Sequence, residues 1–537
     1  MSTSEHRSKT GDAVGVRLAR SAGLTGIATL ASRVLGLARD QVLAALFGAG
    51  NEMDAFNVAF RIPNLVRDLF AEGAMSAAFV PTFTRYLTLR GRADAWRLAN
   101  NVLTALLLLT GAVVVVGVAF ARPIVTLYAG AYASVPGKLE LTIRLTRVMF
   151  PFLMLVASAA AVMGMLNSLH YYFIPALSPA MFNVATIGLA LALVPLMPGL
   201  GQPRIMAIAI GALVGGVGQV ALQWPSLRRE GFRYSPFLDW RDPGLRHVLL
   251  LMGPGTLGLA ATQVNLFINT LLATTQGTGA VSWLAYAFRL MYLPIGLFGV
   301  SVATAVLPTV AHHAAGDDMS GVRDTVSRGI AMTLLLNVPA TLGLLCLATP
   351  IVRLLFEHGQ FVAADTAQTA SALRFYALGL VGYSTARIAS PTFYALRLSR
   401  VPVLVSVASI AINIALSVTL IGPLGFRGLA LATSIAALAN AALLVWRLRR
   451  ALAGLDGRRI AITFAKTAAA ALVMATVAVA ADRGMRELVP GESFMPQATR
   501  LGTAIGASLA ALAMSAKLFR IREFEDVIGV LRRRLAS

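Results

Sequence analysis

The stretch NVLTALLLLTGAVVVVGVAF, residues 101–120, contains no charged side chain at any of its positions. A helix of about 20 apolar residues is long enough to cross a hydrocarbon core of roughly 30 Å. Similar runs recur along the chain, which is 57% hydrophobic and only 13% charged. Soluble proteins average roughly 45–50% apolar and about 25% charged residues, so the composition indicates an integral membrane protein.

Hydropathy predicts an all-α polytopic fold with about 14 transmembrane helices. No short apolar core with a cleavage site follows the polar N-terminus, so we expect the first span to remain as an anchor. The expected spans are roughly residues 21–46, 52–84, 99–121, 141–168, 174–199, 205–227, 244–273, 279–312, 327–350, 366–396, 402–424, 426–450, 460–482 and 498–519.

The net charge of +22 is explained by where the basic residues fall along the chain. With a cytoplasmic N-terminus, the cytoplasmic segments hold about 28 Lys and Arg and the opposite loops hold about 8, the asymmetry of positive-inside insertion. We therefore expect both termini on the cytoplasmic side of the membrane, and anionic membrane lipids as the partners of the basic clusters. Nucleic-acid binding is not expected.

Two segments far apart in the chain resemble each other, which indicates an internal repeat. AFRIPNLVRDLFAEGAMSAAFVPT begins at Ala59, and AFRLMYLPIGLFGVSVATAVLPT begins at Ala287, an offset near 228. We expect two six-helix lobes related as parallel repeats, followed by two C-terminal helices, an architecture found in transporters. The expected parts are a cytoplasmic tail (1–20), an N-lobe (21–235), a C-lobe (236–455) and helices 13–14 with a basic tail (456–537).

Charged residues at membrane depth concentrate in the first two expected spans. Each Arg or Asp at a helix centre costs about 2.5–3.5 kcal/mol on insertion scales, so the set would cost on the order of 20 kcal/mol in lipid. We therefore expect an aqueous cavity, with the end members Asp54 and Glu72 near the interfaces. The set is Arg33, Arg39, Asp40, Asp54, Arg61, Arg67, Asp68 and Glu72.

The spacing of three of these residues predicts one wet helix face. Asp54, Arg61 and Asp68 are seven positions apart, and a helix drifts only about 20° over seven residues. Pro63 is expected to break this helix, because proline removes a backbone donor.

Two further arginines stand in spans that offer them no carboxylate. Arg289 is the repeat partner of Arg61, and Arg387 lies in the tenth span. A buried Arg without an acidic partner keeps its charge and its desolvation cost, so an anion supplied from outside is the expected partner. Arg presents a planar fork of donors that suits phosphate oxygens, and several converging arginines suit a diphosphate.

Catalytic and cofactor chemistry is not indicated. The chain has no Gly-rich loop ending in Lys-Ser/Thr and no His/Glu pair at metal-ligand spacing. The single cysteine, Cys346, lies in an apolar run. We therefore expect a transporter without enzyme activity, cofactor or metal, coupled to the membrane potential or to an unidentified ion. The segment GALVG, residues 211–215, has the spacing of close helix packing.

Several segments together resemble the MurJ (MviN) family, the lipid II flippases of peptidoglycan synthesis within the multidrug/oligosaccharidyl-lipid/polysaccharide exporter superfamily. They are SRVLGLARD (32–40), GAGNEMDAFNVAFRIPNLVRDLFAEGAMSAAFVP (48–81), GMLNSLHYYFIPALSP (164–179), QVNLFINTLLA (263–273), GLFGVSVATAVLP (296–308) and GLALATSIAALAN (428–440). The resemblance covers nearly the whole chain and is most specific between residues 32 and 81.

This resemblance implies a function in cell-wall biogenesis and a set of functional residues, in which the arginines bind the substrate and the carboxylates balance the charge of the cavity. Lipid II would be moved from the inner to the outer leaflet of the cytoplasmic membrane by alternating access, with Asp40, Asp54, Asp68 and Glu72 pairing with the arginines when the cavity is empty. Its polyprenyl tail would lie at the last two helices. The family's functional residues fall on Arg33, Arg39, Arg67, Arg289 and Asp54.

Two family features are missing from this sequence. Phe288 stands where the family usually has Asp, and the expected spans seven to twelve hold no acidic residue well inside them, which argues against a sodium site there. The alternatives are a flippase for another lipid-linked oligosaccharide, a cation-coupled drug exporter, and a non-transporting scaffold for cell-wall synthesis proteins.

Overall fold

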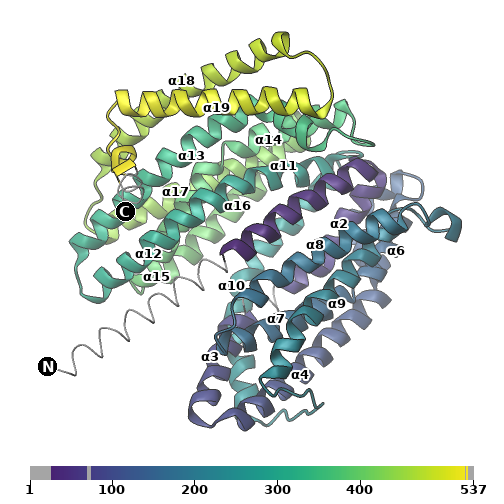
Figure 1. Cartoon of the computed structure of the whole chain (residues 1–537). Coiled ribbons are helices and arrows are strands. Elements are labelled where there is room, and N and C mark those ends of the chain that lie inside the picture. Colours follow the sequence, from purple (N-terminus) through teal and green to yellow (C-terminus); the bar gives the residue numbers. More distant parts are fainter. Residues whose placement is uncertain (1–25, 69–73, 527, 530–537) are drawn as a thin grey trace. The chain divides into compact units, whose positions relative to one another are not determined.

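The computed structural model describes residues 26–68, 74–526 and 528–529, without the side chains of residues 74–77 and 253–261. Within these ranges the chain is helical and contains no strand (Figure 1). The chain divides into two compact units, Met1–Leu271 and Leu272–Ser537.

The first unit is built from a helix over 26–47 and nine further α-helices, with short 3₁₀ turns at Gly130–Ser134 and Pro198–Leu200. These helices are α2 (Asn51–Arg67), α3 (Ala74–Leu89), α4 (Arg92–Ala119), α5 (Ala121–Ala129), α6 (Lys138–Met149), α7 (Phe152–Ser168), α8 (Phe173–Leu193), α9 (Met206–Arg229) and α10 (Pro243–Thr274).

The second unit continues with long helices and one π-helical segment. Its elements are α11 (Ala280–Pro294), the π-helix η4 (Ile295–Gly299), α12 (Val300–Ala315), α13 (Met319–Phe356), α14 (Ala363–Ala377), α15 (Leu380–Ala395), α16 (Arg400–Leu424), α17 (Phe426–Ala451), α18 (Gly457–Leu488) and α19 (Phe494–Leu518).

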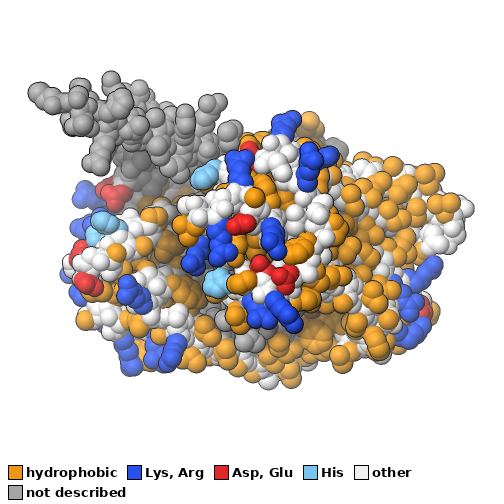
Figure 2. Space-filling view, turned by 90° about the horizontal axis from the view of Figure 1, so that it is seen from below, with side chains coloured by type: hydrophobic (Ala, Val, Ile, Leu, Met, Phe, Trp, Pro, Cys, Tyr) orange, Lys and Arg blue, Asp and Glu red, His pale blue; other side chains and the backbone are white. Residues whose placement is uncertain are grey.

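The prediction of a polytopic helical membrane protein is confirmed. Among the described residues, 10 helical stretches are long and apolar enough to cross a membrane. Four of the expected spans are not among these 10 stretches. They are the first two, which carry the charged residues, the seventh, which corresponds to α10, and the tenth, which is divided between α14 and α15. Large hydrophobic side chains also lie exposed, such as Val115 and Leu127, and Figure 2 shows broad hydrophobic areas beside gathered charges. Contact with lipid tails explains such surfaces.

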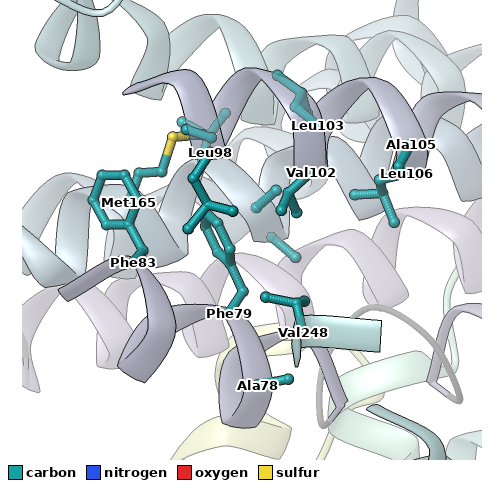
Figure 3. Close-up of a cluster of buried hydrophobic side chains, with 14 of the residues drawn as sticks. Ala78, Phe79, Phe83, Leu98, Val102, Leu103, Ala105, Leu106, Met165 and Val248 are labelled. Carbon is teal, nitrogen blue, oxygen red and sulfur yellow. The ribbon is translucent and has the colours of Figure 1, made fainter. Parts of the chain in front are cut away.

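The core of the first unit forms where α3 and α4 meet α7 and α10. Phe79 and Phe83 of α3 pack with Leu98 of α4 and Met165 of α7, all almost fully buried (Figure 3). Val248 of α10 joins the same cluster. These apolar contacts hold α3 in place on the inner side of the unit.

Small residues bring α8 and α9 into close contact, as the GALVG segment predicts. A Cβ atom added to Gly215 would lie 2.8 Å from the Cα atom of Phe182, and one added to Gly211 would lie 3.1 Å from the Cα atom of Thr186. Only glycine permits the backbones to approach this closely.

The expectation that Pro63 breaks the second span is wrong, because α2 runs through this residue. The side-chain amide of Asn64 donates a hydrogen bond to the carbonyl oxygen of Phe60 at 2.7 Å in the same part of the helix. The regular helix instead ends at Arg67, and Asp68 has π-helical geometry.

The second and eighth spans are irregular at equivalent positions, which supports the internal repeat. Applying the offset of 228 to Asp68 gives position 296, and this position lies inside η4. Segments of π-helix often mark functional sites in membrane and soluble proteins. In both segments the shared Ala-Phe-Arg stretch lies in a helix that leads into π-helical geometry.

Candidate functional site

The helix over 26–47 carries an arginine–aspartate pair that is largely buried in the first unit. Arg39 donates two hydrogen bonds to the same carboxylate oxygen of Asp40, at 2.9 and 3.2 Å, and its guanidinium lies 5.2 Å from the ring centroid of Phe182. The side chains are 13% and 4% exposed. Arg33 lies near the other end of this helix and is exposed.

The end of α2 holds a second arginine–aspartate pair. Arg67 donates two hydrogen bonds to Oδ1 of Asp68, at 2.6 and 2.9 Å, and each side chain is 24% exposed. The side-chain amide of Gln263 on α10 donates to the other oxygen of Asp68 at 3.4 Å. The π-helical turn thus places a guanidinium where solvent still reaches it.

The N-terminal end of α2 carries a buried ion pair. The ammonium group of Lys138, at the start of α6, lies 2.8 Å from Oδ2 of Asp54, and the two side chains are 1% and 0% exposed. The same ammonium lies 4.1 Å from the ring centroid of Tyr132. Asp54 therefore has a lysine partner that sequence analysis did not single out.

Aromatic packing fixes the rotation of α2. Phe60 packs against Phe152 of α7 and Phe182 of α8, with ring centroids 5.5 and 5.8 Å apart. Arg61, Asp54 and Asp68 lie roughly a quarter turn round the helix from Phe60. Arg61 is half-buried there. The face that carries alternating charges is thus separate from the face that packs on α7 and α8.

The second unit places its two arginines on neighbouring helices, α11 and α15. Arg387 donates a hydrogen bond to the Tyr292 hydroxyl at 2.6 Å, and its guanidinium lies 5.7 Å from the Tyr292 ring centroid. Arg289 is exposed and precedes Tyr292 by three residues, so both lie on one face of α11. Phe288, which occupies the family's acidic position, packs instead on Tyr292 and Tyr376.

The structure brings together part of the set predicted from sequence. Arg39 pairs with Asp40 and Arg67 with Asp68, whereas Glu72 lies outside the described residues. The partners that sequence analysis missed are Lys138, Gln263 and Tyr292. Lys138 falls in the predicted loop before the span at 141–168, where a basic residue is typical of the topology, and the other two carry no charge to mark them.

This arrangement is suited to binding an anion and offers no sign of a metal centre. In the described part of the chain, no three His, Cys, Asp or Glu side chains gather as a possible metal site. The arginine pairs are partly open to solvent, and a phosphate oxygen can replace the aspartate oxygen as acceptor with the same geometry. Each unit therefore presents guanidinium groups that a phosphate-containing ligand can reach.

Comparison with known sequences identifies close relatives over most of the chain. The family model described as "Lipid II flippase MurJ" matches residues 43–498. The chain is 36% identical over 514 residues to a probable lipid II flippase MurJ of Rhizobium meliloti, covering 93% of this chain and 92% of that protein. It is 35% identical over 426 residues to the lipid II flippase MurJ of Burkholderia cenocepacia, covering 79% and 82%.

Solved structures show the same fold. A lipid II flippase MurJ in an inward closed conformation matches with a TM-score of 0.76 and 26% identity, covering 92% of this chain and 99% of that one. An inward-facing multidrug resistance transporter of the MATE family, from the MOP superfamily, matches with a TM-score of 0.64 and 17% identity, covering 78% and 95%. The second match extends the fold to the wider superfamily.

Proposed function

The chain belongs to the MurJ family of lipid II flippases, and we propose that its intramembrane arginines bind the diphosphate of lipid II during transfer. The protein is a multi-pass membrane transporter. In this proposal the residues that contact phosphate oxygens are Arg33, Arg39 and Arg67 in the first unit and Arg289 in the second, while Arg387 is held by the Tyr292 hydroxyl. The diphosphate carries the charge that these residues are arranged to accept.

The ion pairs explain how the arginines stay in place without substrate. A cluster of uncompensated guanidinium groups inside a membrane is costly, and pairing each with a carboxylate limits that cost. Arg39 and Arg67 each donate two hydrogen bonds to a single aspartate oxygen, a contact that a phosphate oxygen can take over. Binding of the diphosphate then exchanges one acceptor for another and leaves few charges uncovered.

In this proposal transfer proceeds by alternating access in the bacterial cytoplasmic membrane, with both termini in the cytoplasm. The distribution of Lys and Arg supports this orientation. The membrane potential can drive the cycle, since one charge crossing 100 mV is worth about 2.3 kcal/mol. No covalent bond changes in such a cycle, which is consistent with a transporter.

The observation that carries the proposal is the Arg67–Asp68 pair at the π-helical turn, with both side chains 24% exposed. A guanidinium used only for packing would be expected to lie buried or at the interface. Here it lies within the second span with part of its surface uncovered by protein, and beside a carboxylate that a substrate anion can replace.

Direct binding measurements with purified protein test the proposal. Wild-type protein should bind lipid II more tightly than undecaprenyl phosphate and more tightly than an unrelated lipid-linked glycan. Arg67→Ala and Arg289→Ala should each weaken lipid II binding at least tenfold and abolish complementation of a depleted host, at normal protein level. Arg122→Ala, which removes an exposed arginine that is 58% accessible, is the matched control. Full complementation by both variants would refute the phosphate-binding role.

A further inference from the structure

Lys138 and Asp54 form an ion pair that is almost completely enclosed by the first unit. Its two charged atoms lie 2.8 Å apart, and the side chains are 1% and 0% exposed. The ring of Tyr132 covers the ammonium at 4.1 Å, and this tyrosine is itself 2% exposed. Water therefore has little access to either charge.

The pair joins two helices at the same end of the first unit. Asp54 lies in the first turn of α2, and Lys138 is the first residue of α6. The 3₁₀ turn Gly130–Ser134, which contains Tyr132, precedes α6 and closes over the contact. Breaking the pair would leave one charge buried without its partner, which is far more costly than the pair itself.

Asp54 also belongs to the charged face of α2 that leads to Arg67. The rise of 1.5 Å per residue places Asp54 about 10 Å from Arg61 and about 20 Å from Arg67 along the helix. A carboxylate that loses its counter-charge at these distances repels an anion bound to either arginine. At an effective dielectric constant of about 20, the repulsion at about 20 Å lowers affinity by about fourfold.

We infer that Lys138 is a positioning residue for substrate binding, which anchors the N-terminal end of α2 and neutralises Asp54 so that the diphosphate meets a net positive helix face. This inference rests on the proposed function. The lysine does not touch the substrate. It acts through Asp54, by holding that carboxylate in place and cancelling its negative charge.

Lys138→Met and the double variant Asp54→Asn/Lys138→Met separate the electrostatic role from packing. At low salt, Lys138→Met should bind lipid II about fourfold more weakly than wild type, because the uncompensated carboxylate is buried and salt screens it little. The double variant removes both charges and should bind within about twofold of wild type. Lys466→Met, a lysine on α18 that donates to a backbone carbonyl, is the matched control and should bind normally.

Melting temperatures and Arg67→Ala complete the test. If Lys138→Met does not fold, the double variant still tests the inference, because it carries no uncompensated charge. The inference would be overturned if folded Lys138→Met bound lipid II with wild-type affinity. It would also be overturned if the double variant folded normally but bound lipid II more than tenfold more weakly than wild type. If Arg67→Ala binds lipid II like wild type, the proposed function fails instead. If Arg67→Ala binds weakly while Lys138→Met binds like wild type, the proposed function stands and only the role of Lys138 is removed.

Discussion

Neutralising Asp68 should strengthen substrate binding, although it removes a charged residue from the transport path. In the structure, Arg67 donates both of its hydrogen bonds with Asp68 to a single oxygen, at 2.6 and 2.9 Å. A diphosphate that binds Arg67 has to displace this carboxylate first. The variant Asp68→Asn keeps the size of the side chain and removes the competing negative charge.

The expected gain follows from the strength of the contact that the substrate displaces. Hydrogen bonds to charged groups contribute about 1.5–3 kcal/mol, and we use the lower end because both side chains are 24% exposed and solvent screens them. The asparagine oxygen can still accept a hydrogen bond from Arg67, which retains about 0.5 kcal/mol. The difference of about 1 kcal/mol corresponds to roughly fivefold tighter binding of the diphosphate.

Binding of lipid II to purified Asp68→Asn at low salt measures this gain, and a translocation assay in vesicles measures its cost. Release should slow by a similar factor, because the carboxylate no longer competes with the substrate for Arg67. Asp94→Asn removes an exposed carboxylate at the start of α4 in the same unit and should leave both rates unchanged. Unchanged or weaker binding by Asp68→Asn would refute the displacement argument.

Three further predictions concern helix packing, the second unit and the start of α13. Gly382→Ala should reduce stability by about 1–3 kcal/mol, because its Cβ atom would lie 2.6 Å from the backbone of α17, and both the melting temperature and the protein level in the membrane should fall. Gly506→Ala, with open space around it, is the control and should change stability by less than about 1 kcal/mol. Tyr292→Phe removes the hydroxyl that accepts from Arg387 and should reduce translocation several-fold at normal protein level, a reduction on the order of 1 kcal/mol, whereas full activity would exclude a role for this contact. A backbone hydrogen bond at the start of α13 lowers the pKa of Asp318 below its usual 3.8, so its stabilisation of this helix end is present above pH 3.8 and is lost as the pH falls through the lower folded value. The protection of the first-turn amides against hydrogen exchange, relative to their intrinsic exchange rates at each pH, should fall on acidification in wild type and lose this pH dependence in Asp318→Asn.

Hydropathy and spacing predict most of this fold, because a membrane helix is determined locally. A long apolar run satisfies its backbone hydrogen bonds within itself, so its identity as a span does not depend on distant residues. The same reasoning reaches the site only where partners are adjacent in sequence. Arg39 with Asp40 and Arg67 with Asp68 are neighbours along the chain, and both pairs form in the structure.

Contacts between distant residues are the part that the sequence does not specify. Lys138 is 84 positions from Asp54, and in the sequence it looks like one of many basic residues at the ends of spans. Its burial depends on how α6 packs against α2 and on the turn that carries Tyr132, neither of which hydropathy describes. The cost of charges inside a membrane therefore identifies which residues need partners, whereas packing decides which partners they obtain. In this transporter the two kinds of pair differ accordingly. An arginine paired with the aspartate next to it in sequence can exchange that aspartate for a substrate anion, whereas Asp54 stays paired with the distant Lys138.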